Sequence, residues 1–128
     1  MLNLINDIEK LTLENINFRK VILTTTHQQL VVMSLNPKED IGVEVHNSLD
    51  QFIKIESGEG KALLNGEEFS FSQGFSITIP AGTSHNIINS SEINPLKLYT
   101  VYSPPNHKDG TIHKTKQEAI DNEEHYEA

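Results

Sequence analysis

The stretch SGEGKALLNGEEFSFSQGFSITIP, residues 57–80, decides the fold class. It contains three short apolar runs separated by turn sequences, which is the pattern of paired strands. Asn65-Gly66 is the clearest turn, because both central positions of a two-residue hairpin require positive φ, which Asn and Gly tolerate. Ser57–Gly60 and Ser72–Gly74 mark two further turns. The stretch therefore predicts consecutive antiparallel strands.

The same pattern continues on both sides of this stretch. Short runs precede it (VILTTT, QLVVMSL, GVEVH, QFIKIES) and follow it (HNIIN, LKLYTVYS). Eight or nine short strands without intervening helices predict an antiparallel sandwich or barrel over about residues 18–103. Apolar residues at helical spacing predict a short amphipathic helix over residues 2–11.

The last segment, residues 104–128, is polar and contains Pro104-Pro105 and an Asp109-Gly110 turn. Thr115 to about Glu124 predicts a short helix, with Thr115 as N-cap and Glu118 completing a capping box. The segment is too long and mixed for a linker. We expect it to pack back against the barrel or against a partner subunit.

Length and composition limit the classes of function. The 128 residues, with 36% hydrophobic and 22% charged residues, fit one domain spanning 1–128. The net charge of −8 offers no basic footprint, which argues against nucleic acid and membrane partners. The absence of cysteine excludes disulfides and thiolate sites. With no signal peptide and no long apolar run, we expect a cytoplasmic protein.

Several polar side chains occupy strand positions. Glu44 and His46 are two residues apart and therefore share one face of a strand, while Gln51 shares a face with Ile53. If these two strands pair through the turn NSLD, all three polar groups point into one interior. His85, which begins another strand after PAGTS, would complete the group.

Two imidazoles, one carboxylate and one amide oxygen form a donor set that suits first-row divalent ions such as Zn, Ni, Fe, Mn or Co. Spacing alone leaves another interpretation open, because a Glu-x-His pair in a strand is also found exposed or hydrogen-bonded. An internal Glu–His–Gln cluster with water is the alternative to a metal site.

Taken together, these segments resemble the cupin superfamily over roughly residues 28–102. The second cupin motif, G-x5-P-x-G-x2-H-x3-N, is matched at every fixed position by GFSITIPAGTSHNIIN, residues 74–89. The first motif, G-x5-H-x-H-x3–4-E-x6-G, is matched only in its second half, by His46, Gln51 and Gly58. The resemblance implies an all-β double-stranded β-helix, or jelly-roll barrel, with short N- and C-terminal helices.

The resemblance also implies a ligand set for a divalent transition metal ion (Zn, Ni, Fe or Mn). Cupin sites usually contain three histidines and one glutamate. In this sequence the corresponding positions are Glu44, His46, Gln51 and His85. The carboxylate has thus moved from the fourth place to the first, which preserves the ligand charge.

Three functions are compatible with this resemblance. The first is a metalloenzyme acting on a small polar molecule such as a sugar or sugar derivative, similar to the phosphomannose-isomerase-like cupins. The second is an Fe-dependent dioxygenase, and the third is a non-catalytic small-ligand-binding module. No catalytic residue is assigned. Tyr99, Tyr102, His107 and His113 are candidates to surround the site, although each also suits a structural or exposed role. The resemblance further implies a homodimer.

Overall fold

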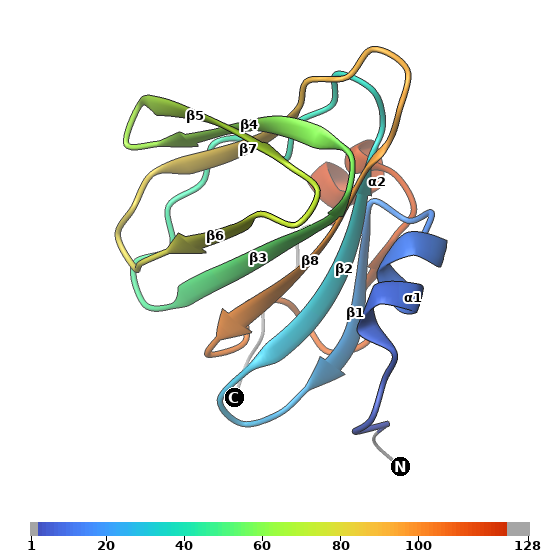
Figure 1. Ribbon diagram of the computed structural model, residues 1–128. Helices are drawn as coiled ribbons and strands as arrows, with labels where there is room; N and C mark the ends of the chain where they lie inside the picture. The colour runs from blue at the N-terminus through green and yellow to red at the C-terminus, as the bar shows by residue number, and fades with distance from the viewer. Residues whose placement is uncertain (1–2, 123–128) are drawn as a thin grey trace.

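The structure is a computed structural model that describes residues 3–122, and two antiparallel sheets form most of it (Figure 1). Its elements are α1 (Ile8–Glu14), β1 (Arg19–Thr24), β2 (Gln29–Leu35), β3 (Asp50–Ser57), β4 (Glu59–Leu64), β5 (Glu67–Ser72), β6 (Ser76–Ile79), β7 (His85–Asn89), β8 (Leu96–Ser103), β9 (Ile112–His113) and α2 (Lys116–Asp121). One sheet has the order β6-β3-β8-β2-β1-β9 and the other β5-β4-β7. The predicted jelly-roll fold class is confirmed.

The hairpin predicted at Asn65-Gly66 is confirmed, whereas β5 and β6, which flank the turn at Ser72–Gly74, lie in different sheets. Asn65 and Gly66 join β4 to β5 with φ angles of 50° and 82°, and Leu64 pairs with Glu67 across the turn. Asn89, the last fixed position of the second motif, has a structural role. Its side-chain amide donates to the carbonyl oxygens of Leu35, Asn36 and Asn94, which joins the end of β7 to two loops.

The interior between the two sheets changes from apolar to polar along the strands. On β8 the inward positions run from Leu96 and Leu98 to Thr100 and Tyr102. On β3 the inward Ile55 and Ile53 are followed by Gln51, which lies opposite Tyr102 in the ladder. Because both strands change character at the same level, one end of the barrel is a hydrophobic core and the other is lined by polar groups.

The segment GVEVH, residues 42–46, is not the strand that the sequence predicts. Together with the two residues before it, it lies along β7 and forms only isolated bridges there, between Asp40 and Ile88 and between Glu44 and His85. Gly42 interrupts the ladder, because its φ of 110° is outside the strand region and its N–H donates to the side chain of Asn86. The expected pairing of this segment with β3 through the turn NSLD is also wrong, since β3 pairs with β6 and β8.

The N-terminal helix lies later in the chain than residues 2–11. It begins at Ile8, where the Asp7 side chain accepts a hydrogen bond from the Lys10 N–H as N-cap, and it ends at Glu14. This capping group stops the helical pattern from continuing toward the N-terminus. The C-terminal helix begins as predicted, with the Thr115 hydroxyl accepting from the Glu118 N–H. The predicted end of that helix, near Glu124, lies outside the described residues.

The segment that follows β8 returns to the barrel. Its strand β9, which the sequence did not predict, pairs with β1 and extends the larger sheet. The fully buried Gln29 fixes the start of this segment. Its amide oxygen accepts from the backbone N–H groups of Asn106 and His107, and its amide nitrogen donates to the His107 carbonyl and the Thr24 hydroxyl, at 2.7–3.2 Å.

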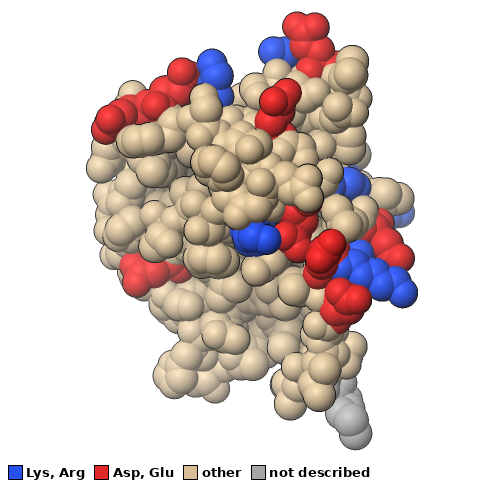
Figure 2. All heavy atoms as spheres, viewed as in Figure 1, with Lys and Arg blue, Asp and Glu red and all other residues tan. Residues whose placement is uncertain are grey.

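Charged side chains lie in separate groups on the face shown in Figure 2. Acidic and basic side chains occur together along the upper margin and in a mixed group that extends from the centre of the view to its right side, with uncharged surface between the groups. None of the helices in residues 3–122 has the length and apolar character needed to cross a membrane.

Gly60 is required where β4 passes between β7 and a buried ring. A Cβ at this position would lie 2.3 Å from the Ile88 carbonyl oxygen and 2.6 Å from Cζ of Phe71. We expect Gly60→Ala to lower the free energy of unfolding by about 1–3 kcal/mol through overpacking. Urea denaturation measures this, with the exposed Ser70→Ala on β5 as control. Equal stability of the two variants would contradict the expected clash.

Gln29 should stabilise the return of the C-terminal segment. We expect Gln29→Leu to lower the free energy of unfolding by about 1–3 kcal/mol, because buried N–H groups lose their acceptor. Hydrogen exchange at Asn106 and His107 should accelerate. Gln28→Leu makes the same chemical change at the exposed neighbouring position and should leave both measurements near wild type. Unchanged exchange in Gln29→Leu would show that other contacts hold the segment.

Candidate functional site

The polar end of the barrel receives side chains from four different segments. Glu44 and His46 come from the 40–46 segment, His85 begins β7, and Gln51 and Tyr102 come from β3 and β8. Glu44 and His85 exchange two backbone hydrogen bonds, each 2.9 Å long. These bonds place Glu44 and His46 beside His85. The structure therefore brings Glu44, His46 and His85 together from opposite ends of the motif region.

His46 is the central side chain of this group. Its Nε2 lies 3.2 Å from Oε2 of Glu44. Its ring centroid is 5.3 Å from that of His85 and 6.1 Å from that of Tyr102, which meets it edge-on. Tyr102 lies opposite Gln51 in the β3–β8 ladder, so the same group extends to β3.

The tautomer of His85 is fixed by its own loop. Its Nδ1 lies 2.9 Å from the carbonyl oxygen of Thr83. A carbonyl oxygen can only accept, so Nδ1 carries the proton and Nε2 of the neutral ring presents a lone pair. A hydrogen bond of this kind to a backbone carbonyl is typical of histidines that ligate metals through the other ring nitrogen.

Gln51 is buried with only part of its amide satisfied. Its Nε2 donates to the Thr100 hydroxyl at 3.1 Å, whereas its Oε1 has no hydrogen-bond partner among residues 3–122. A buried acceptor without a donor costs about 1–3 kcal/mol. The amide oxygen is therefore a group for which a bound cation or a donor from a ligand would be favourable.

The charge states around His46 follow from burial and neighbouring charges. Burial alone would raise the pKa of the Glu44 carboxyl, but the hydrogen bond with His46 and the electrostatic influence of His46, Arg19 and His85 lower it below its ordinary value. Glu44 is thus a carboxylate at neutral pH. Burial raises the pKa of Tyr102 to about 12, so its hydroxyl keeps its proton.

The four expected ligands do not form a ready-made cage. Among residues 3–122, no three His, Asp or Glu side chains converge closely enough to hold a metal ion as they stand. In this structure Nε2 of His46 and Oε2 of Glu44 contact each other directly at 3.2 Å. Two ligand atoms bound to the same ion are separated by a similar distance, so ligation would replace this contact without separating the two side chains.

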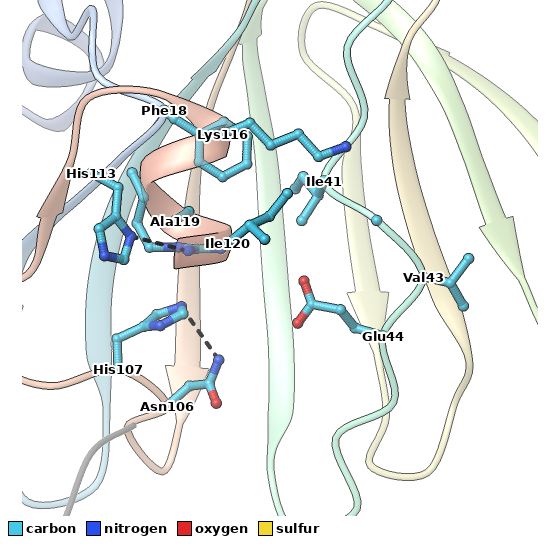
Figure 3. A pocket seen from close by; sticks show the side chains of 12 residues that line it. Phe18, Ile41, Val43, Glu44, Asn106, His107, His113, Lys116, Ala119 and Ile120 are labelled. Atoms are coloured by element: carbon cyan, nitrogen blue, oxygen red, sulfur yellow. Dashed lines mark hydrogen bonds between the residues drawn. The ribbon is translucent and has the colours of Figure 1, made fainter. Parts of the chain in front are cut away.

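A cavity of about 190 Å³ adjoins this group and shares Glu44 with it. In Figure 3, Glu44 lies on one side of this cavity, Asn106 and His107 lie on the other, and α2 closes part of it. His107 Nε2 is 3.4 Å from the Tyr102 hydroxyl and 3.3 Å from Nδ2 of Asn106. His107 and His113 are both buried here, whereas Tyr99 stacks near Phe52, at a centroid distance of 6.4 Å.

Sequence reasoning missed Arg19 and Asn106, which line the same cavity. The sequence contained a signal for Arg19, because it is the only arginine of the chain and shares the inward face of β1 with Val21. Asn106 had none, because it lies in an irregular segment whose position depends on Gln29.

Comparison with known proteins agrees with the fold and the motifs. The profile of the cupin domain matches residues 31–102. The chain belongs to the cupin family. It is 42% identical over 120 residues to the uncharacterized protein YrkC of Bacillus subtilis (strain 168), covering 89% of this chain and 64% of YrkC.

Two further similarities extend over most of the chain. An uncharacterized protein of Acanthamoeba polyphaga mimivirus is 50% identical over 109 residues, covering 83% of this chain and 68% of that protein. The chain thus spans about two thirds of the length of these curated relatives. The crystal structure of BH2720 from Bacillus halodurans superposes with a TM-score of 0.91 at 38% identity, covering 94% of this chain and 95% of that one.

Asp40 holds α2 against the 40–46 segment, because it accepts hydrogen bonds from Lys116 Nζ and from Asn86 Nδ2. These bonds, that of Lys116 first, lower the pKa of the Asp40 carboxyl below its ordinary 3.8, although burial opposes them. A carboxyl group with a lowered folded-state pKa stabilises the fold above its ordinary pKa, and this stabilisation is lost as the pH falls toward the folded-state value.

We therefore expect wild type to exceed Asp40→Asn in free energy of unfolding by up to about 1 kcal/mol near pH 7, since the pair is partly exposed. The difference should shrink below about pH 4. Chemical denaturation across this range measures it, with the exposed Asp109→Asn as control. A difference that is independent of pH would contradict the role of the ionised carboxylate.

Proposed function

We propose that the chain binds a divalent transition metal ion through Glu44, His46, Gln51 and His85 and uses it to act on a small polar molecule. The observation that carries the proposal is the buried Oε1 of Gln51, which lies at the polar end of the barrel and has no hydrogen-bond partner in the described part of the chain. A divalent cation can accept electron pairs from this amide oxygen, from a neutral imidazole and from a carboxylate at the same time.

The donor set fits such an ion in chemistry, and the backbone supports its assembly. The Nε2 lone pair of His85 is available because Nδ1 is committed to the Thr83 carbonyl. Glu44 supplies the single negative charge. Its present contact with His46 is the one that ligation would replace, while the backbone bridge to His85 stays in place.

When bound, the metal ion would supply Lewis-acid polarisation of a carbonyl or hydroxyl oxygen of the substrate. The chain's own residues then orient the substrate and hold protons. Tyr102 keeps its proton at neutral pH and lies between His46 and His107, so its hydroxyl is a donor at the edge of the site. Sugars and sugar derivatives are the first substrates to test.

Metal content tests the first part of the proposal. Untagged protein is incubated with Zn²⁺, Ni²⁺, Mn²⁺ or Fe²⁺, dialysed, and measured by mass spectrometry of the metal. We expect about one ion per chain, and at least about a 100-fold weaker affinity in His46→Ala/His85→Ala, because losing ligands costs more than losing their supporting partners. Gln51→Leu should weaken binding less.

His27→Ala, which removes an exposed histidine in the β1–β2 turn, is the matched control and should bind as wild type does. Circular dichroism verifies that each variant folds. Metal well below one ion per chain after supplementation, or full binding by the double variant, would refute the metal site.

Turnover separates the proposed classes of function. A metal-loaded sample that converts a sugar phosphate or sugar acid without consuming oxygen supports isomerase-like chemistry. Substrate-dependent oxygen uptake by the Fe²⁺-loaded protein would instead assign a dioxygenase. Ligands that raise the melting temperature without being converted would assign a binding module.

A further inference from the structure

Arg19 is a buried cation whose charge no carboxylate of the described chain neutralises directly. Its side chain is 8% exposed, yet the ion pairs within residues 3–122 do not include it. Its Nη1 lies 3.4 Å from His113 Nδ1, and its Cζ lies 5.4 Å from the centroid of the Phe18 ring. No described residue forms a hydrogen bond with its Nε.

This arrangement is costly for the protein alone. A guanidinium group stays charged at every physiological pH, so it cannot escape burial by losing its proton. Because a guanidinium N–H only donates, His113 Nδ1 is the acceptor in their contact and contributes no negative charge. Glu44 acts on Arg19 over a distance, but its carboxylate is engaged with His46. Within residues 3–122, Arg19 therefore has no anionic group in direct contact.

The cavity next to Arg19 has the size and lining for a small anion. Its volume of about 190 Å³ is below the roughly 300–1,000 Å³ of pockets for drug-sized ligands. Asn106 adds an amide to one side, and Phe18, Ile41 and Ile120 supply apolar walls (Figure 3). Lys116 also borders the cavity, but its ammonium group pairs with Asp40.

We propose that Arg19 binds the carboxylate of a small organic acid in this cavity, with the rest of the molecule directed toward Glu44. This inference deepens the proposed function, since it rests on that site and names its substrate class as small carboxylic acids. A guanidinium fork matches a carboxylate with two parallel hydrogen bonds. One uncommitted cation beside Glu44 suits a monoanion, whereas the second charge of a phosphate would be repelled by that carboxylate.

The single arginine gives the proposal a direct spectroscopic probe. In a ¹H–¹⁵N spectrum of the full chain, Arg19 is the only source of an arginine Nε–H signal. The chain is first treated with a chelator, and acetate, glycolate, acetamide or inorganic phosphate is then titrated in. We expect the carboxylates to shift this signal to saturation, while neutral acetamide leaves it in place and phosphate binds at least tenfold more weakly than glycolate.

Variants separate a binding role from a structural one. Arg19→Met should weaken the binding of glycolate, followed by calorimetry, at least tenfold. Its melting temperature without ligand should equal or exceed that of wild type, because a buried unpaired charge has been removed. Arg19→Lys keeps the charge but loses the fork, so it should bind with intermediate affinity. Lys20→Met changes the neighbouring, more exposed position of β1 and should bind as wild type does.

Several outcomes would overturn the inference. They are an Nε–H signal that no carboxylate moves, tighter binding of phosphate than of glycolate, and glycolate affinity in Arg19→Met within twofold of wild type. If Arg19→Met does not fold, the wild-type titration and the glycolate affinity of Arg19→Lys test whether Arg19 binds the carboxylate. The titrations contain no metal, so the two proposals can fail separately. A chain that binds carboxylates but no metal would refute only the proposed function. A chain that binds metal but no carboxylate would refute only this inference.

Discussion

The two backbone hydrogen bonds that Glu44 and His85 exchange are the contact on which the polar end of the barrel depends. They attach an otherwise irregular segment to the edge of β7 and so place Glu44 and His46 beside a histidine about forty residues further along the chain. The same attachment brings Asp40 within reach of Lys116, which holds α2 over the cavity. Without this bridge the site and the pocket beside it would both lose one wall.

The interior of the barrel satisfies its polar groups with two exceptions. Among the described residues, Gln51 Oε1 and Arg19 Nε are the buried side-chain atoms without a hydrogen-bond partner. Their needs are opposite, because the first is an electron-pair donor that favours a cation and the second belongs to a cation that favours an anion. Glu44 borders both. A metal ion beside Gln51 would carry positive charge, and a carboxylate beside Arg19 would carry negative charge. The two bound groups would therefore attract each other, and each would also give a buried polar atom of the protein a partner.

Local signals in the sequence accounted for the elements whose residues determine their own conformation. The hairpin at Asn65-Gly66 and the N-cap at Thr115 were predicted because their chemistry lies within a few residues of each turn. The strand expected at residues 42–46 was wrong, because period-two alternation does not reveal that Gly42 gives its N–H to a side chain of β7. Strand β9 was missed because a two-residue strand exists only through the edge of β1 that it covers.

The sequence by itself indicated an antiparallel sandwich or barrel, because strand periodicity and turn residues are local properties. Its resemblance to the cupin motifs then implied the jelly-roll class and the residue types of the candidate metal site. The tertiary structure decided that Glu44 reaches His85 through β7 rather than Gln51 through a hairpin, and that His46 is engaged with Glu44. It also decided that Arg19 and Asn106 share a cavity. Those facts depend on contacts between segments tens of residues apart, in which a buried group's partner, or its lack of one, exists only after the chain has folded.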